Sequence, residues 1–162
     1  METTDDKSPD PLGWIQHSLQ DLSAFFEGLN RQKVGIAVNL KTPEGLEIIH
    51  KLVAKSDIFV DNFRKGVAER LSLGYEDLIQ YNERLIYASA SGYGPDGPDA
   101  GKPAFALTAE ARAGALWWFG PPDDTPHQLD IADQSAAIML SYDIMGAKWP
   151  GSVSDSGKRS MS

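Results

Sequence analysis

The pattern of apolar and polar segments predicts strands and helices that follow one another along the chain. Short apolar, β-branched segments at residues 34–40 (VGIAVNL), 57–63 (DIFVDNF) and 85–90 (LIYASA) predict three strands, the first of them buried. Thr42-Pro43-Glu44 predicts the start of a helix with Thr42 as its N-cap, and residues 67–73 and 75–81 predict two short helices. Strands that alternate with helices indicate an α/β fold with a parallel sheet.

The second half of the chain predicts a loop and then two helical regions. Residues 91–103 (SGYGPDGPDAGKP) are rich in Gly and Pro, which is typical of turns. Residues 104–118 predict a helix with a weak point at Gly114, and residues 131–147 predict a buried helix entered at Asp133. Residues 1–13 are acidic and contain Pro, so they predict a flexible lead before a folded region at 14–147.

The composition is that of an ordinary globular protein. The 162 residues are 41% hydrophobic and 23% charged, enough apolar material for a core and typical of one domain or a piece of one. No apolar stretch is long enough to span a membrane, and the polar N-terminus is unlike a secretory signal. The chain has no cysteine, which excludes disulfides and thiolate catalysis and fits a cytoplasmic location. We expect no metal site, because His17, His50 and His127 lie far apart.

Charge is distributed unevenly along the chain. The formal net charge of −8 disfavours nucleic acid and anionic membranes as partners. Residues 31–70, however, hold eight cations and five acids, a local charge of +3. This segment suits a small polyanion, and the alternative is a set of solvated helix faces.

Three groups of residues are candidates for a site. Gly92, Gly94 and Gly97 have the spacing of a dinucleotide-binding loop, but Pro98 and Pro103 would interrupt the helix that such a loop requires. Lys41, Arg64 and Arg70 are predicted near one sheet edge, as a phosphate site or as ordinary surface charge. Asp133 is either the N-cap of its helix or a carboxylate offered to a ligand there.

Several segments in order resemble the class III CoA-transferase family. They are NRQKVGIAVNLKTPEG, DIFVDNFRKGVAERLSLGYEDL, NERLIYASASGYGPDGP, GKPAFALTAEARAG and DIADQSAA, between residues 24 and 147. The resemblance implies a partial Rossmann-like parallel sheet with flanking helices, within a longer chain that forms interlocked homodimers. It implies that CoA and acyl-CoA are bound as substrates, with a free carboxylic acid as acceptor. The family's first strand and its second half have no counterpart here.

The resemblance also implies the site residues by position. Asp133 matches the catalytic aspartate of the family. Positions similar to those that bind CoA are Val38, Asn39, Leu40, Lys41, Asn62, Phe63, Arg70, Pro103, Ala104, Phe105 and Ala106. Basic positions near the nucleotide are matched by Arg31, Lys33 and Arg64.

The family contains racemases as well as transferases. The racemase branch has a His-Asp pair at the positions of Phe105 and Ala106, so this chain lacks the proton-abstracting group and transfer is favoured. Many transferases keep an acid at the position of Ala106, so its absence bears on the subtype. The second hypothesis for the isolated chain is a truncated remnant that binds CoA weakly at best.

Residues 148–162 do not continue the resemblance, and we expect them to be an unstructured tail produced by a frameshift. Codons exist for KWPGSVSDSGKRSMS that read VARERFGFGKEVDV when shifted by one nucleotide, and that peptide is what the family would show after this helix. Sequencing the gene tests this prediction. If no VARER-like peptide is encoded in the other frame, the hypothesis is wrong.

Overall fold

In a computed structural model of the chain, residues 18–19, 22–118, 131–149 and 158–161 are described. They belong to two compact units, residues 1–37 and residues 38–162. The first unit contains strands β1 (Ser18–Leu19) and β2 (Leu22–Ser23), paired antiparallel, and helix α1 (Ala24–Leu29).

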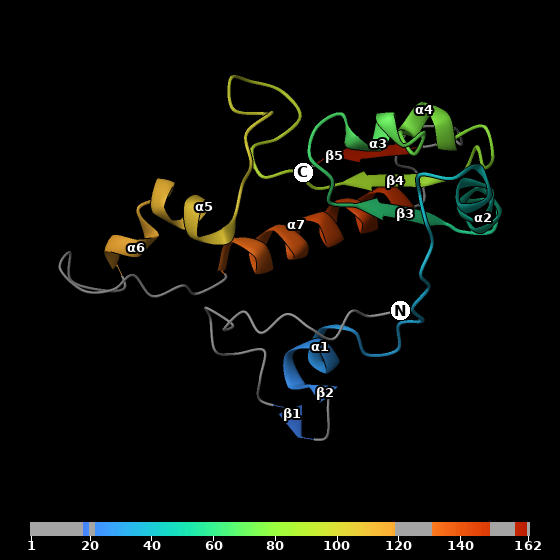
Figure 1. Cartoon of the computed structure of the whole chain (residues 1–162). Helices are drawn as coiled ribbons and strands as arrows, with labels where there is room; N and C mark the ends of the chain where they lie inside the picture. The colour runs from blue at the N-terminus through green and yellow to red at the C-terminus, as the bar shows by residue number, and fades with distance from the viewer. Residues whose placement is uncertain (1–17, 20–21, 119–130, 150–157, 162) are drawn as a thin grey trace. The chain divides into compact units, whose positions relative to one another are not determined.

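The second unit is an α/β structure built on a parallel sheet, as the sequence predicts (Figure 1). The sheet has the order β3-β4-β5, with β3 at Ile58–Asp61, β4 at Ile86–Ser89 and β5 at Lys158–Met161. Ile86 lies opposite Ile58 in one neighbour and opposite Lys158 in the other. The helices are α2 (Pro43–Val53), α3 (Val67–Arg70), α4 (Tyr75–Leu78), α5 (Ala106–Arg112), α6 (Ala115–Trp118) and α7 (Ile131–Lys148).

Helix α2 begins where its capping residues predict. The Thr42 hydroxyl accepts a hydrogen bond from the Gly45 backbone N–H at 3.2 Å, and Pro43 is the first helical residue. Only glycine fits at position 45, because the Cβ of any other residue would overlap the carbonyl of Asn39. The helix turns Leu46, Ile49 and Val53 toward the core.

The core lies where α2, α3 and α4 pack on the first two strands of the sheet. Leu73, Leu78 and Leu85 are fully buried, and Val53 and Tyr87 complete the buried cluster. The Tyr87 ring stacks on Phe59 at 5.4 Å between centroids, and its hydroxyl donates to the Leu73 carbonyl at 3.2 Å. The amide of Asn82 donates to the carbonyls of Val53 and Ser56, which ties the end of α2 to the chain that enters β4.

The predicted buried strand at 34–40 is wrong. Residues 33–39 have no regular structure, and Val34 is 96% exposed. The composition of the segment is that of a strand, but a strand needs a neighbour whose backbone pairs with it. The sheet order β3-β4-β5 does not include this segment.

The last helix begins where the sequence predicts but is less buried than expected. Helix α7 starts at Ile131, and Leu140 is its buried residue, while Ile138, Met139, Tyr142 and Met145 are exposed. Its apolar residues lie all round the helix, so a single packed face cannot cover them. In the expected unstructured tail, Lys148 ends α7 and Lys158–Met161 form β5.

The predicted weak point at Gly114 is confirmed. Gly114 separates α5 from α6 and has a φ of +75°, a left-handed conformation that glycine adopts without strain. Figure 1 shows α3 and α4 on one side of the sheet and α7 along the other. Among the described helices, none combines the length and apolarity needed to cross a membrane.

Replacing Leu85 with Ala is expected to lower the free energy of unfolding by about 2–5 kcal/mol, because it leaves a cavity in the fully buried cluster. Urea denaturation followed by circular dichroism measures this. Leu52→Ala is the matched control, since Leu52 is 46% exposed and should cost less. Equal losses in the two variants would contradict the placement of the core.

Candidate functional site

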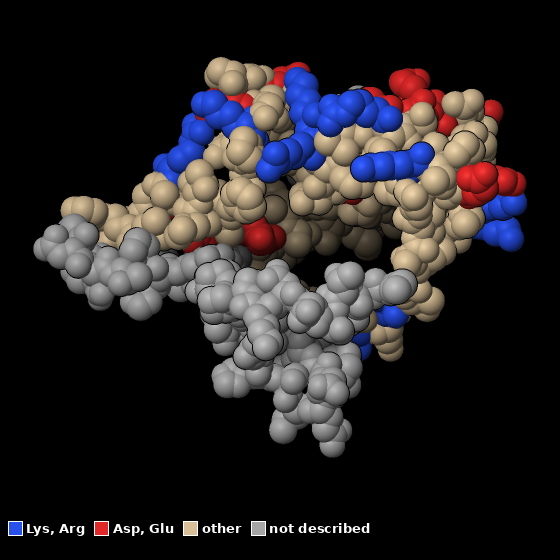
Figure 2. Space-filling view, viewed as in Figure 1, with Lys and Arg blue, Asp and Glu red and all other residues tan. Residues whose placement is uncertain are grey.

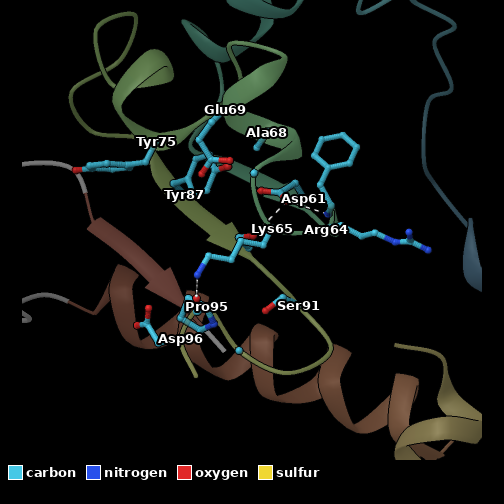
Figure 3. Close-up of a pocket in the computed structure, with 14 residues that line it drawn as sticks. Asp61, Arg64, Lys65, Ala68, Glu69, Tyr75, Tyr87, Ser91, Pro95 and Asp96 are labelled. Carbon is cyan, nitrogen blue, oxygen red and sulfur yellow. Dashed lines mark hydrogen bonds between the residues drawn. The ribbon is translucent and has the colours of Figure 1, made fainter. Parts of the chain in front are cut away.

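A pocket of about 380 Å³ opens at the carboxyl ends of β3 and β4 (Figure 3). The ends of two neighbouring parallel strands are where α/β folds most often bind ligands. The pocket is formed by the end of β3 and the turn after it, by α3 and α4, and by the loop after β4. Its lining residues are Asp61, Phe63, Arg64, Lys65, Gly66, Ala68, Glu69, Tyr75, Tyr87, Ser89, Ser91, Gly94, Pro95 and Asp96.

Asp61 and Asn62 hold the two strand ends together. One oxygen of the Asp61 carboxylate accepts from the Phe63 backbone N–H at 3.0 Å and from the Ser89 hydroxyl at 3.2 Å. The Asn62 side-chain amide donates to the Ala90 carbonyl at 3.1 Å. Asp61 is 6% exposed, and its other oxygen has no hydrogen-bond partner. These contacts fix the floor of the pocket.

Basic side chains surround the opening. Arg64 and Lys65 line the pocket, and the Lys65 ammonium donates to the Pro95 carbonyl at 2.6 Å. Arg70 points back toward the turn after β3, since its guanidinium would contact a Cβ on Gly66 at 3.4 Å. Figure 2 shows Lys and Arg side chains gathered over α3 and the loop between β4 and α5. Asp61, Glu69 and Asp96 also line the pocket, so these cations offer local contacts for an anionic group rather than a net positive opening.

The loop between β4 and α5 is held in place at three points. At its base, a Cβ on Gly92 would overlap the side chain of Ala104, so the two ends of the loop lie in contact. Lys65 holds it at Pro95. The Asp99 carboxylate binds Lys102 at 2.5 Å and Arg112 at 2.6 Å, and the Arg112 guanidinium lies over the Tyr93 ring.

The structure around Gly92, Gly94 and Gly97 decides whether these glycines form a dinucleotide-binding loop. The segment with Gly92, Gly94 and Gly97 is followed by turns rather than by a helix, and α5 begins at Ala106. A dinucleotide fingerprint needs a helix N-terminus at the motif, so that reading is excluded. Gly94 and Gly97 instead supply positive φ values of 76° and 103° for the turns.

The pocket brings together two of the residues that the sequence suggested, Phe63 and Arg64. Val38, Asn39, Leu40 and Lys41 lead into α2, where the Asn39 side chain accepts from the Lys41 backbone N–H at 3.0 Å. Asn62 and Arg70 flank the pocket, as described above. Arg31 and Lys33 belong to the first unit, are exposed there, and are described within that unit alone.

Pro103, Ala104, Phe105 and Ala106 lie at the entry to α5. Phe105 precedes the helix and is exposed, whereas Ala106 is buried in its first turn. None of the four carries an acid or a base. Their place at the base of the loop makes them a boundary of the loop rather than part of the pocket lining.

Asp133 lies in the first turn of α7 and is exposed. It is not the residue that caps the helix. Instead Glu110 on α5, 3% exposed, accepts from the backbone N–H of Ile131 at 2.9 Å and of Ala132 at 3.5 Å. Asp133 therefore lies inside the first turn rather than at the N-cap position, and its exposed carboxylate stays a candidate for contact with a ligand.

The direction of α7 places its N-terminus beyond the carboxyl ends of the strands (Figure 1). At the other end of the helix, the Lys148 ammonium contacts Asp57, the residue before β3, at 3.4 Å. The 18 residues of α7 are about 27 Å long, roughly twice the length of four-residue β4. The first turn of α7 therefore extends past the sheet edge on the side where the pocket opens.

Sequence reasoning missed Asp61, Lys65, Ser89 and Glu110. Asp61 and Ser89 are the last residues of their strands, a signal that could have identified them. Lys65 belongs to the basic segment at residues 31–70, but the sequence did not identify it as a site residue. Glu110 carries no local signal, since its partners are more than twenty residues away. Within the described residues, no group of His, Asp and Glu is placed to hold a metal ion.

Comparison with known families matches residues 4–157 to CoA-transferase family III. The chain belongs to CoA-transferase family III. It is 42% identical over 130 residues to an acetyl-CoA:oxalate CoA-transferase of Acetobacter aceti, covering 78% of this chain and 33% of that protein. It is 35% identical over 131 residues to a succinyl-CoA:glutarate CoA-transferase of Mus musculus, covering 81% and 30%. The chain thus spans about a third of the length of these relatives.

Solved structures show the same fold. A CAIB/BAIF family protein from Brucella suis superposes with a TM-score of 0.65 at 29% identity, covering 86% of this chain and 37% of that one. A hypothetical protein from Mycobacterium tuberculosis gives a TM-score of 0.70 at 29% identity, covering 76% and 36%.

We predict that the ion pairs of Asp99 with Lys102 and Arg112 are lost at strongly acidic pH. Hydrogen bonds from Lys102 and Arg112 hold the pKa of Asp99 below the usual value of an aspartate. A carboxyl group whose pKa is lower in the folded state stabilises the fold at pH values above its pKa in the unfolded chain. This stabilisation is lost as the pH falls through the pKa of the folded state. NMR titration of the Asp99 carboxyl should give a midpoint below that of an ordinary aspartate, and Lys102→Met should raise this midpoint. A midpoint unchanged by this substitution would contradict the ion pair between Asp99 and Lys102.

Proposed function

We propose that this chain carries the CoA-binding and acyl-transfer part of a CoA-transferase, with Asp133 as the nucleophile. The observation that carries the proposal is the family match over residues 4–157, together with relatives that move CoA between carboxylic acids. The exposed position of Asp133 in the first turn of α7 supports it. Acyl-CoA and a carboxylic acid would then be the ligands of this chain.

The pocket offers a place for the anionic part of CoA. CoA carries phosphates, and the Arg64 guanidinium at the pocket can bind a phosphate with two charge-assisted hydrogen bonds. Arg70, the last residue of α3, points toward the turn after β3 and can contact the same phosphate. Lys41 precedes α2, and Phe63 offers an apolar surface in the pocket.

The chemistry needs one carboxylate and no external energy source. An oxygen of Asp133 attacks the thioester carbonyl of the acyl-CoA, the carbon–sulfur bond breaks, and CoA leaves as a thiolate. The product is a mixed anhydride between Asp133 and the acyl group. The thiolate then attacks the Asp133 carbonyl, which releases the donor acid as a carboxylate and leaves an aspartyl-CoA thioester.

The acceptor acid reverses these steps. Its carboxylate attacks the aspartyl thioester, forms a new anhydride and frees the thiolate. The thiolate attacks the acyl carbonyl of the acceptor, which yields the new acyl-CoA and restores the Asp133 carboxylate. Each step exchanges one activated acyl bond for another, so atoms and charge balance without a further reactant.

Two alternatives have their own signatures. An acyl-CoA racemase would need a base near the α-carbon, and Phe105 and Ala106 supply none at the positions where the sequence comparison expects one. A remnant that binds CoA weakly is favoured by one observation: α7 exposes Ile138, Met139 and Tyr142. The homodimer and the cytoplasmic location expected from the sequence stay predictions.

We expect that incubating the chain with succinyl-CoA or acetyl-CoA forms a thioester of CoA on Asp133, because its carboxylate is free to react. Mass spectrometry of the intact chain and of its peptides measures the adduct. Asp133→Asn should abolish it, and Asp143→Asn, on the same helix, should leave it unchanged.

The same experiment separates the alternatives. Exchange of the α-proton of the acyl group with deuterated water and no adduct would indicate a racemase. CoA binding at millimolar concentration with neither adduct nor exchange would indicate the remnant. An adduct on a residue other than Asp133 would overturn the assignment of the nucleophile.

A further inference from the structure

The carboxylate of Glu110 is a buried charge to which the proposed reaction assigns no part. Glu110 is on α5, is 3% exposed, and lies in contact with the first turn of another helix. One of its oxygens accepts from the backbone N–H of Ile131 at 2.9 Å and from that of Ala132 at 3.5 Å. Its other oxygen is buried and has no hydrogen-bond partner.

The first N–H groups of any helix lack partners within the helix, so they need an acceptor from elsewhere. In most helices a Ser, Thr, Asp or Asn just before the first turn provides it. Among the described residues, an acceptor for the Ile131 and Ala132 N–H groups of α7 comes from α5, more than twenty residues earlier in the chain. A carboxylate is well suited to this place, because the N-terminal end of a helix carries partial positive charge.

Asp133 is only two residues from Ile131 and belongs to the same first turn. A carboxylate at that position is itself able to accept from the free N–H groups of the turn. Glu110 accepts from two of these groups, the N–H of Ile131 and that of Ala132, and no hydrogen bond or ion pair joins the Asp133 carboxylate to another described residue. Asp133 is exposed.

We propose that Glu110 is the positioning residue for Asp133: by capping α7 from α5, it fixes the first turn and leaves the Asp133 carboxylate free to react. The proposal rests on the function proposed above. A buried charge with one unpaired oxygen is costly, and stability alone does not require it. The cost is explained if the orientation of the first turn of α7 matters for the reaction.

The conservative variant Glu110→Gln keeps an oxygen acceptor for the two N–H groups, whereas Glu110→Leu fills similar space without one. Hydrogen exchange of the Ile131 and Ala132 amides, measured without substrate, tests the cap alone. Exchange should be slow in the wild type and in Glu110→Gln and should be faster in Glu110→Leu. Equal exchange rates in all three proteins would overturn the proposal.

The rate at which the CoA adduct forms on Asp133 tests the positioning. In Glu110→Leu we expect this rate to fall roughly 10- to 100-fold, as for a misplaced reacting group, while the affinity for CoA stays within about twofold. Glu110→Gln should restore most of the rate. A Glu110→Leu rate equal to that of the wild type, or a Gln variant as slow as the Leu variant, would overturn the proposal.

The proposed reaction and the proposed role of Glu110 can be disproved separately. If the wild type binds CoA but forms no adduct, the proposed function fails and Glu110 has no nucleophile to position. If the wild type forms the adduct and Glu110→Leu loses rate and CoA affinity in parallel, the residue is structural and only this inference fails.

Discussion

The parallel pairing of β3 with β4, and the contacts that join their carboxyl ends, are the constraint on which the site depends. Ile58 to Asp61 pairs residue for residue with Ile86 to Ser89. At the end of that ladder, Asp61 binds Ser89 and Asn62 binds Ala90, so side-chain hydrogen bonds join the strands where the pocket begins. The turn after β3 and the loop after β4 leave from these two fixed points, and both line the pocket.

The parts of the fold that the sequence predicted correctly are those with local causes. Helix α2 starts at its predicted residue because Thr42, Pro43 and Gly45 determine the cap within four positions. The break at Gly114 is equally local. The segment 34–40 has the composition of a strand, but its prediction failed because pairing depends on a neighbour far away in the sequence.

The same distinction holds for the candidate site. Phe63 and Arg64 could be placed from the sequence because they follow directly on a recognisable strand. Glu110 could not, because the cap it provides joins residues on two helices that only the tertiary structure brings together. Asp133 was correctly located near a helix start, but its side chain could be interpreted only after Glu110 was seen to occupy the N–H groups.

The strand β5 has a consequence for how this sheet tolerates changes in its amino-acid sequence. Lys158–Met161 is a polar segment, yet it lies parallel to β4 with four residues in register. Strand pairing uses main-chain groups that every residue except proline possesses in full. This border of the sheet is therefore permissive toward side-chain replacement but strict about spacing, since inserting one amino acid would turn each following side chain to the opposite face.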